Sequence, residues 1–388
     1  MRTFDAAIIG SGIIGGSIAF ELSRHGLSVV LLDRQEPGRE ASWAAGGMIS
    51  PTPHLREDAQ LAPFAKLSAA LYPEFVSSVE NASGNTVGFR SDGAMELSLS
   101  SDAEEKRDQT IAYLARLGFE TRALSGDDAR RLEPEISPNV RAALLLPTEA
   151  RVNPRELTEA VLQAAARHGA EILANAEVVA VSKSGGAVDG VTCVRPTELG
   201  ELPKNAATDP VRAKYVVLAA GCFSAQITGA EIFAPVRPVR GQMVALAPRT
   251  QTLRHSLRSE FGYLVPWSDG RIVAGSTLED VGFEKAVTPA GLSRILRAVG
   301  EMAPSLDGAP IVETWSGLRP DTPDHLPLLG PTELRGLIVA TGHYRNGILL
   351  APATARAVRE WITSGRTSLP VEDFSPMRFA GQTHTAKC

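Results

Sequence analysis

The chain has 388 residues, which is enough to bury the cores of two or three domains. Its hydrophobic share of 44% and charged share of 21% are those of an ordinary globular protein. A formal net charge of −5 gives no support for binding to nucleic acid or to an anionic membrane. The three cysteines, at positions 193, 222 and 388, lack the spacing of a disulfide framework or a zinc site, so we expect no metal and a cytoplasmic setting.

The first 33 residues predict a β-α-β unit. A short apolar run, typical of a buried parallel strand, leads into the glycines Gly10, Gly12 and Gly15. Apolar residues then recur at helical spacing as far as Arg24, and a second apolar run ends at Asp33. Gly10 permits a tight turn, Gly12 lets the backbone approach a pyrophosphate, and Gly15 lets the helix lie close to the strand.

The acid at the end of this unit indicates which dinucleotide it binds. A carboxylate at Asp33 accepts hydrogen bonds from a ribose and repels a 2′-phosphate, which favours FAD or NAD over NADP. The N-terminus of the helix offers free N–H groups and the positive end of its dipole to the phosphates. The unit by itself does not choose between FAD and NAD.

The following stretch contains a second cluster of small residues, at 40–48. Its backbone and its short side chains, Ser42 among them, can lie close to a flat or phosphorylated group. Apolar periodicity and turn residues then predict a helix over 60–82, a hairpin of 87–90 with 94–97, helices over about 102–117 and 126–132, and a strand over 142–146.

The middle of the chain returns to helix and strand patterns. Asn153 as N-cap and Pro154 at the first helical position predict a helix that ends near His168. We expect a buried strand over 213–221 that ends in small residues and places its backbone against a cofactor. Between these two elements the sequence predicts strands near 171–174, 177–183 and 187–194, and an exposed loop over 196–210.

The last part begins with strands of period-two patterning over 235–283, which predict a second domain with a broad antiparallel sheet. A final unit consists of a strand over 336–341, a glycine-rich turn over 342–347 and a helix to residue 362. Between them we expect a helix over about 288–302, a strand over 312–315 and a loop that holds Arg319, and we expect the polar tail 365–388 to be loosely held.

Two glycine turns, at 10–15 and 342–347, therefore follow strands at opposite ends of the chain. In one sheet they would converge on a single cofactor, the first on its diphosphate and the second elsewhere. The N-terminus of the last helix, near Asn346, would face an electron-rich group. Because a reduced flavin carries negative charge that a helix dipole stabilises, the second turn favours FAD. The alternative to a cofactor site is a turn that only caps a core helix.

Three side chains are candidates for binding a substrate carboxylate. Arg319 offers a planar, bidentate set of donors, and Arg345 would be a second cation near the same strand ends. The hydroxyl of Tyr263 could donate to the same carboxylate. A single arginine most often forms a surface ion pair, and a tyrosine in a sheet is most often simply half-buried. Only the positions of these residues after predicted strands favour a binding site.

With these motifs the sequence resembles the D-amino-acid oxidase superfamily of FAD enzymes, and within it the glycine oxidases, which are associated with making the glycine imine for thiamine biosynthesis. The matching stretches run from the start of the chain to about residue 362, and residues 342–352 discriminate best. The resemblance implies that Arg319 binds the substrate carboxylate, that Tyr263 assists it and that Arg345 lies beside substrate and flavin. It implies that FAD is bound, without a covalent link, by Gly10, Gly12, Ile14, Gly15, Asp33, Arg34, Ser42, Ala45, Gly46, Gly47, Met48, Val178, Ala220, Gly221, His343, Arg345, Asn346, Gly347, Ile348 and Leu349.

The prediction is thus an α/β fold with a Rossmann-type FAD-binding domain and a second α+β domain on a largely antiparallel sheet. We assign residues 1–85, 141–232 and 318–365 to the first domain and residues 86–140 and 233–317 to the second. The expected reaction is oxidation of glycine, sarcosine or D-alanine to the imine and 2-oxo acid, with O2 reduced to H2O2. Two alternatives are a D-amino-acid or sarcosine dehydrogenase that uses an electron carrier, and a flavin-binding sensor without turnover. Likeness to the family also implies a homotetramer.

Overall fold

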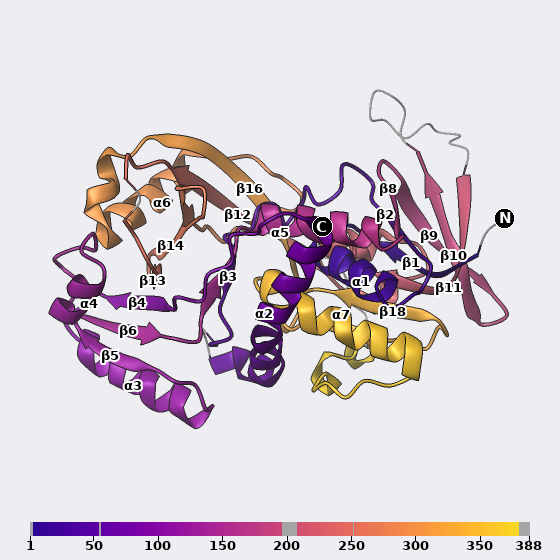
Figure 1. Cartoon of the computed structure of the whole chain (residues 1–388), viewed down its shortest axis with the longest axis horizontal. Coiled ribbons are helices and arrows are strands. Elements are labelled where there is room, and N and C mark those ends of the chain that lie inside the picture. The colour runs from indigo at the N-terminus through magenta and orange to yellow at the C-terminus, as the bar shows by residue number, and fades with distance from the viewer. Residues whose placement is uncertain (1–2, 54–55, 196–207, 251, 380–388) are drawn as a thin grey trace.

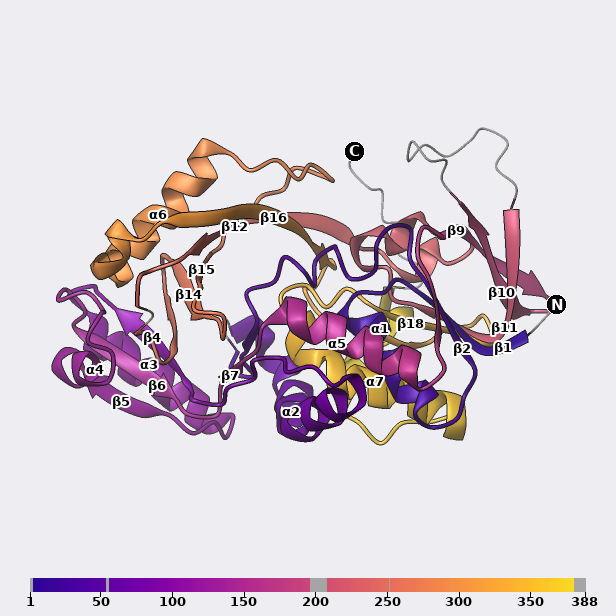
Figure 2. The ribbon, with the colours of Figure 1, turned by 45° about the horizontal axis from the view of Figure 1, so that its top comes forward.

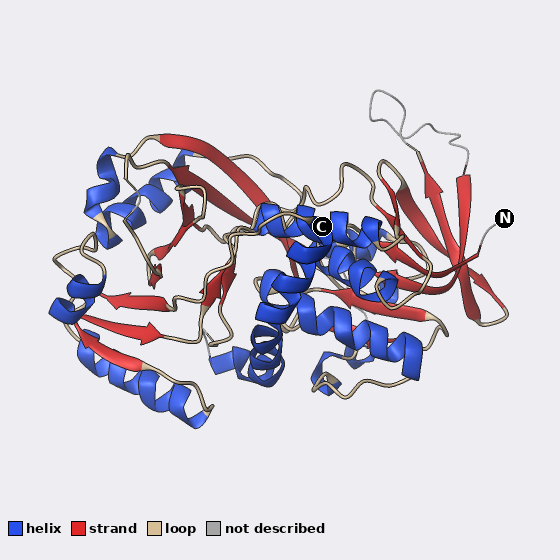
Figure 3. Cartoon of the chain, viewed as in Figure 1, coloured by secondary structure: helices blue, strands red, loops and turns tan. Residues whose placement is uncertain are grey.

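The computed structural model describes residues 3–53, 56–195, 208–250 and 252–379. Two eight-stranded sheets lie toward opposite ends of the long axis of the molecule (Figure 1). In the same view, Figure 3 shows a group of helices between the strands at the two ends. The α/β class and the division into two sheets agree with the sequence prediction.

The first sheet has a parallel centre, in the order β8-β2-β1-β11-β18. Strand β17 adds to one edge in antiparallel sense, and the β9-β10 hairpin pairs with the N-terminal half of β11. The strands are β1 (Thr3–Ile9), β2 (Val29–Leu32), β8 (Glu171–Leu173), β9 (Glu177–Ser184), β10 (Ala187–Val194), β11 (Thr208–Leu218), β17 (Leu328–Pro331) and β18 (Leu337–Thr341).

Four helices cover one face of this sheet: α1 (Ile13–Ser23), α2 (Ala62–Ser83), α5 (Pro154–Arg167) and α7 (Gly347–Ser364) (Figure 2). Alternate residues of β1 serve the two faces, because Ile8 packs among these helices while Ile9 packs on the side of the β9-β10 hairpin. Helix α1 lies close to β1 because Gly15 has no side chain. A Cβ at Gly15 would lie 1.8 Å from the Gly10 carbonyl oxygen, so the predicted role of this glycine fits its position.

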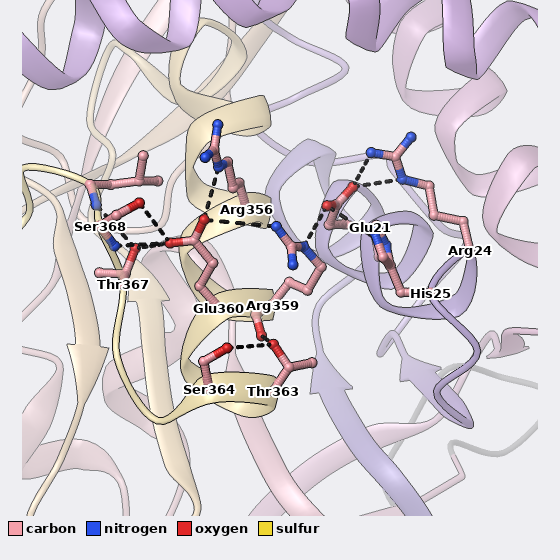
Figure 4. A network of polar contacts seen from close by, with 11 residues as sticks. Glu21, Arg24, His25, Arg356, Arg359, Glu360, Thr363, Ser364, Thr367 and Ser368 are labelled. Carbon is pink, nitrogen blue, oxygen red and sulfur yellow. Dashed lines mark hydrogen bonds and ion pairs between the residues drawn. The ribbon is translucent and has the colours of Figure 1, made fainter.

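A network of ion pairs joins α1 to α7 (Figure 4). The Glu21 carboxylate of α1 accepts from Arg24 at 2.7 Å and from Arg359 of α7 at 2.8 Å. Arg359 also lies 3.8 Å from Glu360, whose carboxylate accepts from Arg356 at 2.9 Å. Glu21 and Glu360 are both largely buried, so the network fixes the first and the last helix of the fold against each other.

The Glu360 carboxylate also holds the chain just after α7, through the N–H of Ser368 at 2.9 Å and the hydroxyl of Thr367 at 2.8 Å. Burial alone would raise the pKa of Glu360, but these hydrogen bonds and Arg356 outweigh burial and lower the pKa from 4.5 to about 2. A lowered pKa in the folded state stabilises the protein above pH 4.5, and this contribution is lost as the pH falls toward 2.

We therefore expect Glu360→Gln to lower the free energy of unfolding by about 1–2 kcal/mol at pH 7. The difference from the wild type should shrink steadily as the pH falls below 4.5. Thermal unfolding at a series of pH values from 7 to 3 measures both effects. Glu372→Gln, an exposed carboxylate just after the same helix, is the matched control and should change little at any pH. A difference that stayed constant with pH would contradict the assignment.

The second sheet has the order β16-β12-β15-β14-β13-β4-β6-β5. All of its pairs are antiparallel except β4 with β13, so the expectation of a largely antiparallel sheet is confirmed. The strands are β4 (Ala94–Ser98), β5 (Arg122–Ser125), β6 (Ala142–Leu146), β12 (Arg237–Leu246), β13 (Ser256–Ser259), β14 (Gly262–Pro266), β15 (Ile272–Gly275) and β16 (Ile311–Asp321); helices α3 (Ala103–Arg116), α4 (Gly126–Leu132) and α6 (Pro289–Met302) accompany it.

The predicted hairpin of residues 87–90 with 94–97 is wrong. Strand β4 pairs with β6 and β13 instead, and residues 87–90 run beside residues 151–153. In that region Arg90 and Arg151 exchange backbone hydrogen bonds, and the Asn153 N–H donates to the Val87 carbonyl at 3.1 Å. The turn residues Asp92 and Gly93 do separate the two segments, but the pairing partner of each segment lies far away in the sequence.

Two predicted domain limits need correction. Strand β6 belongs to the second sheet, so residue 141 is too early for a return to the cofactor domain. Strand β16 continues through residues 318–321 in register with β12, so residue 317 is too early an end for the second part. Both limits were misplaced because an apolar run shows where a strand lies in the sequence but does not show to which sheet the strand belongs.

The expectation of a loosely held tail is wrong for residues 366–379. Leu369, Val371 and Phe374 are buried in the core beside α2 and α7, and the Phe374 ring lies 5.5 Å from that of Phe64. Residues 380–388, and residues 196–207 of the predicted exposed loop, lie outside the described residues. Within the described ranges, no helix has the length and apolar character needed to cross a membrane.

Candidate active site

A cavity of about 430 Å³ lies where the carboxyl ends of β1, β2, β11 and β18 face the second sheet. Carboxyl ends of parallel strands are the usual ligand site of such folds. The cavity lining brings together all predicted site residues except Gly15, which lies beneath the first turn. It contains Gly10, Gly12, Ile14, Asp33, Arg34, Ser42, Ala45, Gly46, Gly47, Met48, Val178, Ala220, Gly221, Tyr263, Arg319, His343, Arg345, Asn346, Gly347, Ile348 and Leu349.

One end of the cavity is formed by the turn into α1. Gly10 has a φ of 99°, and a Cβ there would lie 2.6 Å from the Ala219 carbonyl oxygen, so only glycine fits. A Cβ at Gly12 would lie 3.0 Å from the Ser42 hydroxyl oxygen, which accepts the Ile13 N–H at 2.8 Å. A bare backbone at the N-terminus of a helix is a suitable site for a diphosphate.

Asp33 lies at the end of β2 beside this turn. One carboxylate oxygen accepts the Ser11 N–H at 2.9 Å and the Ser11 hydroxyl, and the other accepts the Gln35 N–H at 3.1 Å. The next residue, Arg34, places its guanidinium 3.4 Å above the ring of Phe223, which also lines the cavity. The fixed carboxylate suits the ribose of an adenosine, and the stacked Arg34 and Phe223 lie beside it.

The N-terminus of α7 opens on the other end. No side chain of a described residue caps it, and its first residues, Gly347, Ile348 and Leu349, line the cavity. Their N–H groups have no partner among the described residues and can meet an electron-rich ligand. His343, in the turn before the helix, is buried and shares a hydrogen bond of 3.1 Å with Thr354. Burial lowers the pKa of His343 to about 3, so its imidazole is neutral near pH 7.

Arg319 enters the cavity from the second sheet. It lies within β16, opposite Val239 of β12, and not in a loop after a strand as predicted. Its guanidinium donates to the Thr277 carbonyl at 3.2 Å and to the Ser276 hydroxyl at 2.6 Å. The strand pairing and these two bonds fix the direction of the side chain more firmly than a loop would.

The charge of Arg319 has no counter-ion in the part of the chain that the structure describes: no carboxylate lies within 4.0 Å of it. Burial lowers the pKa of the guanidinium, and the charge of Arg345 acts in the same direction, yet an arginine remains a cation near pH 7. Arg345 also makes no ion pair with any described residue. A cation held in a cavity without a partner is a suitable site for a carboxylate ligand.

Three further residues shape the surroundings of Arg319 and were missed in the sequence. Met243 is buried, and its sulfur accepts the hydroxyl of Tyr263 at 3.3 Å. Ser276 holds the guanidinium, and Gly241 of β12 leaves room for it, because a Cβ there would lie 2.2 Å from Arg319 Nη1. A glycine inside a strand pattern signals such a close approach, but Met243 and Ser276 carried no signal.

Other chemistry receives no support from the described residues. No group of three or more His, Cys, Asp or Glu side chains among them is placed to hold a metal ion. Cys222 lines the cavity, but burial raises the pKa of its thiol to about 12, so the thiol stays protonated and unreactive. That FAD is held without a covalent link remains a prediction.

Comparisons with known proteins agree with this geometry. The family model described as "FAD dependent oxidoreductase" (DAO) matches residues 5–361. A glycine oxidase of Geobacillus kaustophilus is 30% identical over 385 residues, which cover 98% of each protein. The solved structure of a glycine oxidase from that species covers 97% of this chain and 99% of its own, with a TM-score of 0.88 and 29% identity.

Two other matches are a longer protein and an oxidase named for another amine. A bifunctional ThiO/ThiG protein of Trichormus variabilis is 32% identical over 99% of this chain, which spans only 56% of that longer protein. The structure of an iminodiacetate oxidase from Chelativorans sp. BNC1 is 26% identical, with a TM-score of 0.83 over 96% of this chain and 98% of its own. With a glycine-lined diphosphate turn, a free helix N-terminus and a family match over most of its length, the chain belongs to the DAO family of FAD-dependent oxidoreductases.

Proposed function

We propose that the protein oxidises glycine or another small amine-bearing carboxylate, such as sarcosine or D-alanine, to the imine. The imine then hydrolyses to the 2-oxo acid, and O2 takes the electrons to give H2O2. The observation that carries this proposal is the Arg319 guanidinium, which has no counter-ion among the described residues and lies in a cavity lined by both glycine turns. The similarity to glycine oxidases over almost the full length of the chain supports the same substrate class.

The described side chains have orienting roles in this reaction. Arg319 binds the carboxylate, and the Tyr263 hydroxyl, now on Met243, can turn to the same ligand. FAD, when bound, supplies the hydride acceptor, so no side chain has to act as an obligatory base. Neutral His343 adds no charge next to the amine, and the free N-terminus of α7 favours negative charge nearby.

A second candidate substrate has two carboxylates. Arg345 lines the same cavity without an ion-pair partner among the described residues, and its turn is joined to the strand of Arg319 by the Tyr344 N–H, which donates to the Pro320 carbonyl at 2.9 Å. Two cations in one cavity suit an amine dicarboxylate, and a similar structure is that of an iminodiacetate oxidase. Iminodiacetate therefore belongs among the first compounds tested.

The deciding experiment is an anaerobic absorption spectrum of the FAD-loaded protein mixed with glycine, sarcosine, D-alanine or iminodiacetate. We expect bleaching of the flavin band by at least one amine, and peroxide once air is admitted. Bleaching with dye reduction but no peroxide would indicate the dehydrogenase instead. No bleaching with any amine would favour a flavin-binding protein without turnover. We further propose a cytoplasmic, homotetrameric enzyme, which gel filtration with light scattering tests for the oligomer.

A further inference from the structure

Three tryptophans surround one arginine next to the cavity, and we call Trp43, Trp267, Trp315 and Arg155 the Trp-Arg cluster. The Arg155 guanidinium lies 3.5, 4.6 and 5.3 Å from the ring centres of Trp43, Trp315 and Trp267. It also makes a two-pronged ion pair with Glu313 of β16, both N–O distances being 2.9 Å. The cluster therefore joins the start of α5 to the second sheet, with aromatic faces around a paired cation.

The donors of this cluster bond to three backbone carbonyls within residues 43–47, which we call the cavity segment. Arg155 Nε donates to the Trp43 carbonyl at 3.2 Å. The indole N–H groups of Trp315 and Trp267 donate to the carbonyls of Ala44 at 3.1 Å and Gly46 at 2.9 Å. Both indoles are buried, so these carbonyls have been withdrawn from water and from the cavity.

The N–H groups of the cavity segment differ from one another: those of Ala44 and Ala45 donate to the carbonyls of Glu40 and Ser42. Those of Gly46 and Gly47 have no hydrogen-bond partner among the residues that the structure describes, and both glycines line the cavity. The Gly47 carbonyl is taken by the Val152 N–H at 2.9 Å. Gly46 also touches the ring of Tyr263, since a Cβ on it would lie 3.0 Å from Tyr263 Cε2. The peptide between Gly46 and Gly47 thus has its carbonyl bonded to Trp267, while its N–H has no partner among the described residues.

We propose that Trp267 is a positioning residue for the cofactor. By holding the Gly46 carbonyl on the far side, its indole N–H directs the Gly47 N–H, which belongs to the same peptide and points the opposite way, toward an acceptor atom of FAD. A glycine pair has no Cβ to prevent rotation of the peptide between them, so the direction of this peptide depends on its hydrogen bonds. The same contact sets the position of Gly46 against Tyr263. The proposal rests on FAD as the cofactor of the family and is independent of the substrate.

The test compares Trp267→Phe with Trp43→Phe. Trp267→Phe removes the donor to the Gly46 carbonyl and leaves this buried carbonyl unpaired. Trp43→Phe shortens a ring of the same cluster, but the indole N–H that it removes bonds to no described residue. We expect Trp267→Phe to weaken FAD binding about tenfold and to shift the visible spectrum of the bound flavin. Trp43→Phe should leave the FAD dissociation constant within about twofold and the spectrum unchanged.

Thermal unfolding of the apoprotein separates positioning from stability. Equal losses of FAD affinity in both variants, or a lower Tm for Trp267→Phe with unchanged FAD affinity and spectrum, would overturn the proposal. If Trp267→Phe does not fold, the same comparison is made with benzothienylalanine at position 267, which keeps the shape of the indole without its N–H, and unchanged FAD affinity and spectrum there would count against the proposal. Because no amine is turned over, these results are separate from those that test the proposed reaction.

Discussion

Arg319→Met is expected to raise the KM for glycine by roughly 30-fold to 4000-fold, with FAD still bound. Loss of one partner of a desolvated, hydrogen-bonded charge pair costs about 2–5 kcal/mol, and each 1.4 kcal/mol is about tenfold in affinity. The side chain is a cation without a counter-ion, so its removal leaves no buried carboxylate behind among the described residues. The fold should therefore tolerate the change, and the effect should fall on the ligand.

Steady-state kinetics and anaerobic titration of the bound flavin measure this effect. Arg254→Met is the matched control, because Arg254 is exposed, lies outside the cavity lining and makes no side-chain hydrogen bond or ion pair with a described residue. It removes the same charge and should leave KM within about twofold. An unchanged KM in Arg319→Met would end the assignment of Arg319 to the carboxylate.

Gly241→Ala is the second change with a large expected effect, a rise in KM of about tenfold to 100-fold. The backbone of Gly241 does not have a positive φ, so alanine suits it. The new Cβ would lie 2.2–2.5 Å from Nη1, Nη2 and Cζ of Arg319, and these are the nearest atoms that it would meet. The end of a flexible side chain gives way more readily than backbone does, so Arg319 moves and the fold remains.

This prediction has a strict internal check. In the double variant Gly241→Ala with Arg319→Met, KM should equal that of Arg319→Met alone, because the alanine then has nothing to displace. Gly308→Ala, a position with open space around it, is the control for the substitution itself. A large fall in Tm for Gly241→Ala, or effects that multiply in the double variant, would contradict a direct action on Arg319.

The cofactor half of the site could be read from the sequence because its signals are local. Gly10, Gly12 and Asp33 belong to one β-α-β unit, in which each residue has its role within about 25 residues of chain. The second turn, which ends at Gly347, follows the same logic of strand, glycine and helix N-terminus. The geometry of such a unit is determined by its own residues, and the parallel sheet then brings the ends of the two units together.

The substrate half depends on contacts between distant strands. Gly241, Met243 and Arg319 meet because β12 pairs with β16 in one register, and no local pattern states that register. The resemblance to a family pointed to Arg319, yet not to its place inside a strand. For the same reason the partner of β4 was predicted wrongly and β6 was placed in the cofactor domain, and the burial of Phe374 against Phe64 was not visible in a polar tail.

The hydrogen bond between the Tyr344 N–H and the Pro320 carbonyl links the residue after Arg319 to the turn that starts α7. The strand that carries Arg319 and the turn that begins α7 are therefore joined by main-chain atoms. Substitutions of side chains such as Met243 and Tyr263, which lie on other strands of the second sheet, leave this main-chain link intact. The cavity lining can thus vary in bulk and polarity while the strand of Arg319 and the start of α7 keep their relative position.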